Sequence, residues 1–270
     1  GDPGPDGEAA VLLDKHGLLA NHSQAAAPGD LITLADLDGL LPGADPAPGT
    51  EGTTMSEADF ADVEAVVHTI ATTAVANEKY FGDLDAVVGD GDFGYSMSRG
   101  FELVLEGWDG FDRTDIGTFL KKVAIMITSR IGGTSGPIWG TAFLRAGTTA
   151  GAVTTLDGDQ IVAMLRASIA GIKARGKSDL GDKTLLDALE PAVDVIELQI
   201  KAGHPAAEVL RAAAVTARDR AEATTEMIAK RGRASYTGER SIGTLDAGAV
   251  AVAVMFEALA DQWADRPAST

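Results

Sequence analysis

Apolar residues recur at spacings of three and four over much of the chain after residue 55. The first run is Phe60, Val63, Val67, Ile70 and Ala74. Such spacing places side chains on one face of a helix. Two further runs have the same spacing: Ile116, Phe119, Leu120, Val123 and Ile127, and then Ile161, Met164, Leu165, Ile169 and Ile172.

Three longer segments, 184–202, 205–230 and 247–264, also have the composition of helices, and Gly and Pro separate the helical segments. Pro137 and Pro205 stand at positions typical of a first helical turn. The alternating pattern of a β-strand is nearly absent. About eight helices joined by glycine-rich loops predict an all-α fold, an antiparallel up-and-down bundle whose loops can gather at one end.

The first 54 residues differ from the rest of the chain. They are rich in Pro, Gly, Ala and Asp, and they carry nine acidic residues against one basic residue, Lys15. Their apolar stretches are too few to bury a core, so residues 1–54 are predicted to be an acidic extension or linker. The compact domain is predicted over residues 55–270, where Ser56 and Asp59 resemble a capping box before the first helix.

The composition limits the classes of partner and binding site that are possible. Lys and Arg total 22 against 40 Asp and Glu, a net charge of −18, which excludes nucleic acid and anionic membranes as partners because both bind basic side chains. The absence of Cys excludes disulfides and thiolate zinc sites, and it fits a cytoplasmic location. No apolar run reaches the roughly 20 residues of a membrane span, and no signal peptide is recognisable. So acidic a protein must bind phosphates locally, through cations, helix N-termini or backbone N–H groups.

Three aspartates stand close together in the sequence, at Asp85, Asp90 and Asp92, with no Lys or Arg nearby. Uncompensated carboxylates repel one another, so bringing them together is costly without a cation. Carboxylate oxygens suit Mg²⁺ or Ca²⁺, but the segment lacks the central Gly and final Glu of an EF-hand, which favours Mg²⁺ shared with phosphate. The alternative is an Asp- and Gly-rich turn between two helices.

Three other loops are rich in glycine. Residues 131–137 have the sequence IGGTSGP, in which the backbone can approach a phosphate closely just before a helix begins. The segment is not a Walker A loop, because no Lys follows the glycines, and a plain turn between packed helices would have the same composition. Residues 176–184 and 232–243 form the other two loops. The last contains Arg233 and Arg240, which suit either a phosphate site or simple helix caps.

Four stretches occur in the order LDAVVGDGDFG, GGTSGPIWGTAFLRAG, GKSDLGDKTLLDAL and GRASYTGERSIGTLDAG. In sequence, order and spacing they closely resemble the L subunit of dihydroxyacetone kinase (DhaL), the family of nucleotide-binding domains of dihydroxyacetone and related ketose kinases. The resemblance covers residues 57–265. It implies an eight-helix antiparallel barrel with the nucleotide bound by loops at one end.

The resemblance also implies roles for individual residues. Asp85, Asp90 and Asp92 would bind two Mg²⁺ ions that bridge the phosphates of ADP or ATP. Arg233 would meet the phosphates and is the candidate catalytic residue. Phe93 stands where His or Cys is common in the family, so its polar contact is lost. The remaining nucleotide contacts would come from Phe93, Gly94, Tyr95, Ser96, Thr134, Ser135, Gly176, Leu185, Asp246, Ala247 and Gly248.

A kinase of this family also needs a ketose-binding domain, and this sequence contains none. The resemblance therefore implies a DhaK-type partner subunit that holds dihydroxyacetone or a similar ketose. In one branch a DhaM-type phosphocarrier protein rephosphorylates the bound ADP, and in the other ATP is an ordinary substrate. Phe93 favours a variant ketose kinase, such as an ATP-dependent one for erythrulose. Two alternatives stay open: a non-catalytic nucleotide-binding regulatory subunit, and a nucleotide domain of the fatty-acid-kinase type.

Overall fold

The computed structural model describes residues 57–266, except residues 132 and 134. Over these residues the predicted all-α class is confirmed. Eight of the described helices have 15 to 19 residues, and α3 is shorter. The α-helices are α2 (Phe60–Ala76), α3 (Glu78–Ala86), α4 (Asp92–Glu106), α5 (Ile116–Arg130), α6 (Ser135–Ala150), α7 (Gly158–Gly176), α8 (Leu186–Lys201), α9 (Ala206–Ala223) and α10 (Ala247–Ala264), and the 3₁₀ segments are η1 (Trp108–Gly110), η2 (Thr224–Glu226) and η3 (Arg233–Ser241).

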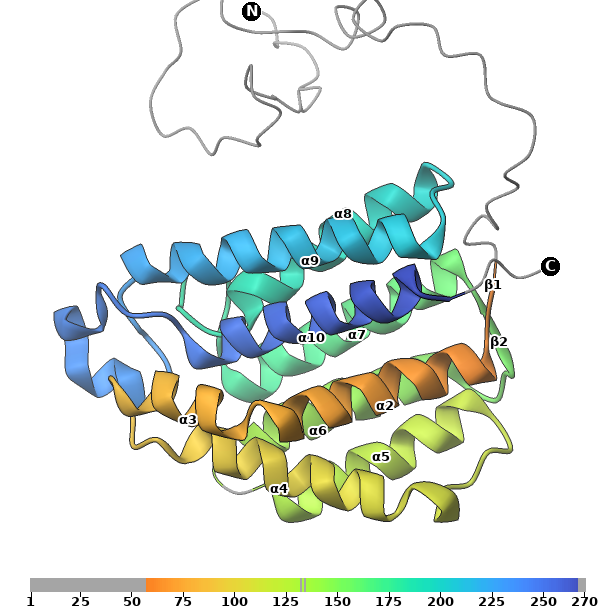
Figure 1. Cartoon of the computed structure of the whole chain (residues 1–270), viewed down its shortest axis with the longest axis horizontal. Coiled ribbons are helices and arrows are strands. Elements are labelled where there is room, and N and C mark those ends of the chain that lie inside the picture. Colours follow the sequence, from red (N-terminus) through yellow and green to blue (C-terminus); the bar gives the residue numbers. More distant parts are fainter. Residues whose placement is uncertain (1–56, 132, 134, 267–270) are drawn as a thin grey trace, which may run out of the picture. The chain divides into compact units, whose positions relative to one another are not determined.

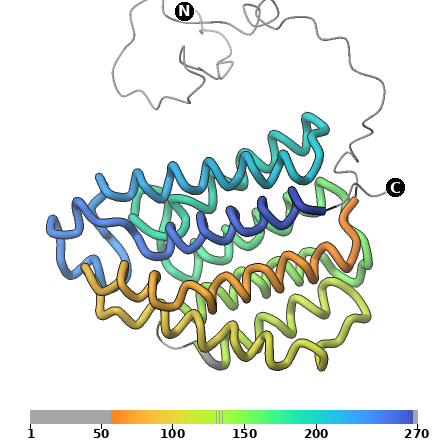
Figure 2. Tube along the Cα trace, in the orientation of Figure 1, coloured from red at the N-terminus to blue at the C-terminus, as the bar shows by residue number. Residues whose placement is uncertain are grey.

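The long helices pack largely in chain order. Each of α4 to α9 contacts the next long helix, α2 contacts α4, and α10 also contacts α2 (Figure 1). Neighbouring helices run in opposite directions, as the Cα trace in Figure 2 shows. As a result α4, α6, α8 and α10 all begin at the end of the molecule that carries α3 and η3, whereas α2, α5, α7 and α9 begin at the other end. Closure of this bundle into the family's barrel remains a prediction.

A two-stranded antiparallel clip lies at the end opposite α3. It consists of β1 (Glu57–Asp59) and β2 (Thr155–Asp157), and it pairs Glu57 with Asp157. Each strand leads directly into a helix, β1 into α2 and β2 into α7. The alternation of three residues is too short to be recognised in the sequence, so the strands were not predicted.

The start of α2 differs in detail from the prediction. Asp59 is itself the N-cap, and it forms a capping box with Asp62: each side chain accepts a hydrogen bond from the backbone N–H of the other residue, at 2.9 and 3.1 Å. The predicted partner Ser56 lies outside the described residues. The division of the chain at residues 54 and 55 also falls outside them.

The predicted helix over residues 205–230 ends earlier, at Ala223. The buried hydroxyl of Thr224 donates to the carbonyl oxygen of Ala221 at 2.6 Å and accepts from the backbone N–H of Asp246 at 2.9 Å. This side chain therefore replaces helical hydrogen bonds and turns the chain toward the start of α10. Residues 227–246 are therefore not α-helical, and they include the 3₁₀ segment η3 with Arg233.

The core runs through the bundle, and α10 contributes most densely to it. This helix is the one described segment that is long and apolar enough to cross a membrane, yet half of that window is buried inside the protein. Val250, Met255 and Leu259 are all buried against the neighbouring helices. Its unusual hydrophobicity is therefore explained by burial within the bundle, where residues 249–253 are all buried.

Candidate functional site

The three aspartates converge where α3 ends and α4 begins. Carboxylate oxygens of Asp85, Asp90 and Asp92 all lie within 4.8 Å of one another. Asp85 is partly buried, while Asp90 and Asp92 are exposed. The backbone N–H of Phe93 points to the Asp85 carboxylate at 3.5 Å. Three oxygen donors at this separation fit the ligand set that a hard divalent cation prefers.

Two glycines make this convergence sterically feasible. A Cβ at Gly89 would lie 2.3 Å from the Oδ1 atom of Asp85, so any side chain there would push the carboxylate out of the cluster. Gly91 has φ +75°, a left-handed conformation that glycine adopts without strain. The sequence Val88-Gly89-Asp90-Gly91-Asp92 is thus shaped around the carboxylates, which argues against a plain helix-connecting turn.

Arg233 reaches the aspartates from a distant part of the chain. Its guanidinium contacts the carboxylate of Asp90 and lies 3.3 Å from the Oδ2 atom of Asp92. All three side chains are substantially exposed. The expected proximity of Arg233 to the acidic cluster is found, but the guanidinium meets the aspartates themselves. It supplies the positive charge that the local sequence around the cluster lacks.

The second predicted loop is held against α4 by one side chain. Ile131 packs so closely on Gly100 that a Cβ there would lie 1.9 Å from its Cγ1 atom, and its carbonyl oxygen would lie 2.1 Å from a Cβ at Gly136. Ser135 is the first residue of α6 and is partly buried. Thr134 lies outside the described residues, so its role stays a prediction.

The third and fourth loops meet beside the starts of α8 and α10. A Cβ on Gly248 would contact Cβ of Leu185 at 3.3 Å, and one on Gly176 would contact Cδ1 of Ile138, in α6, at 3.2 Å. Ala247 is the first residue of α10. These contacts join Gly176 to α6 and Leu185 to the start of α10, and Leu185, Gly176 and Gly248 are all partly buried.

Asp246 caps α10 and has an altered acidity. Its carboxylate accepts a hydrogen bond of 2.7 Å from the backbone N–H of Ala249. Burial raises the pKa of Asp246 from 3.8 to about 7, and the nearby carboxylate of Asp187 adds to the rise. The N–H of Ala249 and the charge of Lys183 oppose it.

The residues at the start of α4 have unequal surroundings. Phe93 packs into the core, with its ring centroid 6.1 Å from that of Phe81. Gly94 is buried, and a Cβ there would lie 1.9 Å from the carbonyl oxygen of Glu78, so this glycine is required by the contact of α4 with α3. Tyr95 is exposed and Ser96 partly buried. Phe93 and Gly94 thus position the helix, whereas Tyr95 and Ser96 are available for contacts.

Sequence reasoning missed a set of buried polar residues beneath the loops. Lys183 and Asp187 are only 2% and 4% exposed. The Asp187 carboxylate accepts backbone N–H groups of Gly181 at 2.5 Å and Thr184 at 2.7 Å. The only available signal was that two basic residues, Lys177 and Lys183, stand in a glycine loop of a protein that has few bases, and this does not single out Lys183.

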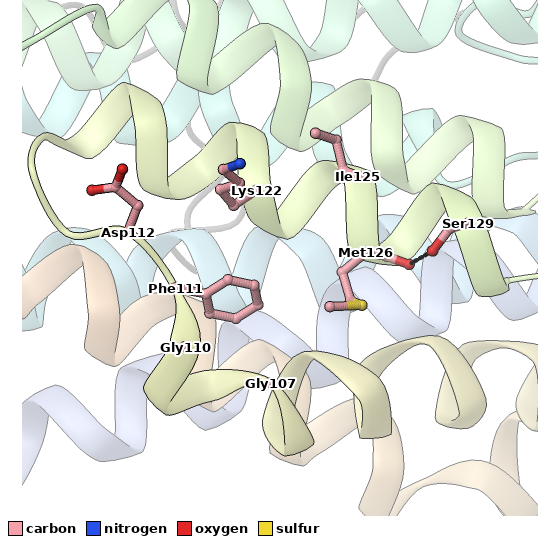
Figure 3. A pocket seen from close by; sticks show the side chains of 8 residues that line it. All are labelled: Gly107, Gly110, Phe111, Asp112, Lys122, Ile125, Met126 and Ser129. Carbon is pink, nitrogen blue, oxygen red and sulfur yellow. Dashed lines mark hydrogen bonds between the residues drawn. The ribbon is translucent and has the colours of Figure 1, made fainter.

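A hollow of about 390 Å³ lies elsewhere on the surface, between the region after α4 and the outer side of α5 (Figure 3). It is lined by Phe111, Met126 and Ile125, with Asp112 and Lys122 at its edge. None of the predicted site residues lines this hollow. With one acid and one base, it lacks the charge of a phosphate site.

Residues 87–261 match the family model of the DAK2 domain, and the chain belongs to this family. The resemblance noted from the sequence is thereby confirmed.

Several relatives are known by function. The chain is 38% identical over 182 residues to the ADP-binding subunit DhaL of the PEP-dependent dihydroxyacetone kinase of Escherichia coli, covering 67% of this chain and 87% of that one. It is 36% identical over 240 residues to L-erythrulose 1-kinase of Mycolicibacterium smegmatis, covering 83% of this chain but 41% of the kinase. The crystal structure of the dihydroxyacetone kinase of C. freundii matches with a TM-score of 0.60 at 26% identity, covering 83% of this chain and 38% of that one.

Proposed function

We propose that the chain is the nucleotide-binding subunit of a dihydroxyacetone-type kinase, which binds Mg-ADP or Mg-ATP and passes a phosphoryl group to a small ketose held by a partner. The observation that carries this proposal is the aspartate triad with Arg233 beside it, at the end of the bundle where four helices begin. Phosphoryl transfer needs chiefly positioning and charge stabilisation, and these residues supply both.

Each group has a defined task in this proposal. Asp85, Asp90 and Asp92 would hold two Mg²⁺ ions, and these would supply positive charge to the phosphates. Arg233, which contacts Asp90 and Asp92 here, would stabilise the charge of the transferred phosphoryl group. The N–H groups at the start of α6, next to Ser135, bind phosphate oxygens.

The remaining predicted residues hold the nucleoside. Gly176 and Leu185 form the apolar side of the adenosine site, and Ala247 and Gly248 close it beside Asp246. A cofactor complex of this kind has a solved counterpart: the dihydroxyacetone kinase of C. freundii in complex with AMP-PNP and Mg²⁺ matches this chain with a TM-score of 0.59 at 25% identity.

The acceptor site belongs to a DhaK-type partner in this proposal, and a cytoplasmic location follows from the same assignment. In the described residues, His68 lies in α2 and His204 lies just before α9, both outside the site loops. The described site therefore contains no histidine that could capture a ketose. Without a positioned acceptor within about 3–3.5 Å of the phosphorus, the γ-phosphate has no productive target.

A direct assay tests the proposal. The chain should bind Mg-ADP in calorimetry and convert no dihydroxyacetone by itself, with conversion appearing when a matching ketose-binding subunit is added. Turnover of the ketose by the purified chain alone at rates above about 1 s⁻¹ would contradict the need for a partner. Absence of Mg-nucleotide binding would contradict the whole proposal.

A second substrate is favoured by one observation. The similarity to L-erythrulose 1-kinase extends over 83% of this chain, compared with 67% for the E. coli ADP-binding subunit. Erythrulose and free ATP should therefore be tested beside dihydroxyacetone and a DhaM-type phosphocarrier protein. Conversion of erythrulose with ATP, and not with the phosphocarrier, would assign the chain to that branch.

A further inference from the structure

A buried lysine joins the third loop to the fourth. Lys183 is only 2% exposed, and its backbone has φ +60°, a left-handed conformation that is uncommon for residues other than glycine. Backbone strain of this kind persists only where the surroundings hold the residue in place. The side chain is directed away from solvent into residues 227–246, which we call the arginine segment.

The ammonium of Lys183 is saturated by carbonyl groups of the arginine segment. It donates to the carbonyl oxygens of Ser241 at 2.5 Å, Thr244 at 2.7 Å and Met227 at 3.2 Å. An ammonium has three protons, so these three acceptors satisfy it. Among the ion pairs of the described residues, none includes Lys183.

These three carbonyl groups bracket Arg233. Met227 precedes it, and Ser241 and Thr244 follow it, so one cation ties both flanks of the segment to the third loop. Between these points the segment consists of turns and 3₁₀ helix with a break at Gly238, which has φ +57°. A segment without α-helical or β-sheet hydrogen bonds has little rigidity of its own. Its geometry therefore depends on side-chain contacts, which include the Ser241 hydroxyl that accepts the Ala229 N–H at 2.9 Å within the segment, and the Lys183 ammonium from outside it.

Burial of an ammonium without a carboxylate partner is costly, and an apolar residue would avoid the cost. Desolvation lowers the pKa of Lys183, and the charge of Asp246 opposes this effect. The protein thus retains a charge in an unfavourable place. A buried charge at this position is explained if Lys183 makes hydrogen bonds that an apolar side chain cannot make.

We propose that Lys183 is a positioning residue that fixes the arginine segment so that Arg233 is held over Asp90 and Asp92. This inference rests on the proposed function, because it assigns Lys183 to the Mg-nucleotide site. Lys183 acts through Arg233 and does not itself touch the phosphates. The proposal gives the third loop a mechanical role next to its predicted contact with adenosine.

A double-mutant cycle in the full chain tests the proposal, with Mg-ADP affinity from calorimetry as the readout. Arg233→Ala should weaken binding about tenfold in the wild-type background, as expected for a charge-assisted contact. Lys183→Met should weaken it to a similar degree. In the Lys183→Met background, Arg233→Ala should cost less than about twofold, because Arg233 is no longer in place. Additive effects of the two substitutions would overturn the proposal.

Lys173→Met is the matched control. Lys173 also lies beside the third loop, but its ammonium pairs with Asp179 at 2.7 Å and Glu190 at 2.8 Å. Arg233→Ala should keep its full tenfold effect in that background. Loss of the Arg233 effect in the control as well would overturn the proposal, because any disturbance of the third loop would then suffice.

A second measurement needs no nucleotide. Amide hydrogen exchange should accelerate in residues 227–246 of Lys183→Met and stay unchanged in α2 and α5. If wild-type protein fails to bind Mg-ADP, the proposed function fails, and this exchange pattern still decides whether Lys183 holds the segment. If Lys183→Met does not fold, Lys183→Gln, which keeps two donors without charge, takes its place. Failure of both variants to fold would overturn a positioning role in favour of a purely structural one.

Discussion

The two ends of the bundle treat their helix N-termini differently. At the end with the strand clip, α2, α5 and α7 begin with Asp59, Asp115 and Asp157, and each of these side chains accepts a hydrogen bond from the backbone of its own first turn. At the other end, α4 begins at Gly91 and α8 at Leu185, and neither has a side-chain cap.

A capped helix N-terminus contributes to the stability of the fold, whereas an uncapped one is available for ligand binding. A capped helix end has its N–H groups satisfied within the protein, which stabilises the fold but leaves less capacity for a ligand. An uncapped end leaves its N–H groups and the positive end of the helix dipole free for an anion. Each end has one exception. At the clip end α9 follows Pro205 and has no side-chain cap, and at the site end Asp246 caps α10, where burial raises its pKa to about 7.

The largest expected effect is on binding at the uncapped end. Asp90→Asn should weaken Mg-ADP binding by about 100-fold or more, because it removes a metal-ligand charge. The apo protein should keep its stability to within about 1 kcal/mol, since the Arg233–Asp90 pair is exposed. Calorimetry measures the first effect, and denaturant unfolding the second. Asp83→Asn is the control, because this exposed aspartate pairs with Lys79 at 2.6 Å, away from the cluster. The Asp83→Asn variant should bind Mg-ADP with wild-type affinity.

The exceptional cap should make stability depend on pH. The folded-state pKa of Asp246 is about 7, raised from 3.8, so the unfolded chain loses this proton first as pH rises between these values. Stability is therefore fully present below 3.8 and is lost as pH rises through 7. Asp246→Asn should remove this loss, so its stability relative to wild type should increase by about 1–3 kcal/mol from pH 4 to pH 8. A constant difference across that range, from urea unfolding, would contradict it.

A smaller effect is expected at the capped end. Asp157 accepts the backbone N–H of Gln160 at 2.8 Å, within a capping box. Asp157→Ala should lower the free energy of unfolding by about 1 kcal/mol and leave Mg-ADP affinity unchanged. A loss of affinity at this distance from the loops would show that the two ends are coupled.

The smallest effect is expected from residues 1–54. A protein that starts at Met55 should keep its melting temperature and its affinity for Mg-ADP, because residues 1–54 have too few apolar side chains to form a core. A decrease in Tm of more than about 5 °C in calorimetric scans would show that the extension packs on the domain.

The fold was predictable because its signals are local. Runs such as Phe60 to Ala74 place one apolar face per helix, and Val63, Val67, Ala71 and Ala74 are indeed buried. Helix ends were less predictable, because Thr224 ends α9 through a hydrogen bond to Asp246, 22 residues away. The helix propensity of residues 205–230 does not reveal this partner, because Asp246 lies outside that segment.

Within the candidate site, the aspartate cluster was predictable for the same reason. The aspartates and glycines are close in sequence, so their convergence could be inferred from spacing. The contact of Arg233 with Asp90 spans more than half of the described residues, and the resemblance to a known family suggested the region but not the partner. Lys183 was missed because its importance depends on burial, and nothing in the sequence distinguishes a buried lysine from an exposed one.

The strand clip has a consequence for the order of folding events. Pairing Glu57 with Asp157 closes a loop that contains α2 to α6, and the entropy lost on closure grows with loop length. Helices that form first shorten the distance the two strands must cover, so we expect the clip to form after the rate-limiting step. Leu156→Ala, in the buried centre of β2, should then speed unfolding and leave the folding rate nearly unchanged in a chevron analysis. The clip would thus lower the unfolding rate of the part of the bundle formed by α2 to α6. It would have little effect on the rate at which these helices assemble.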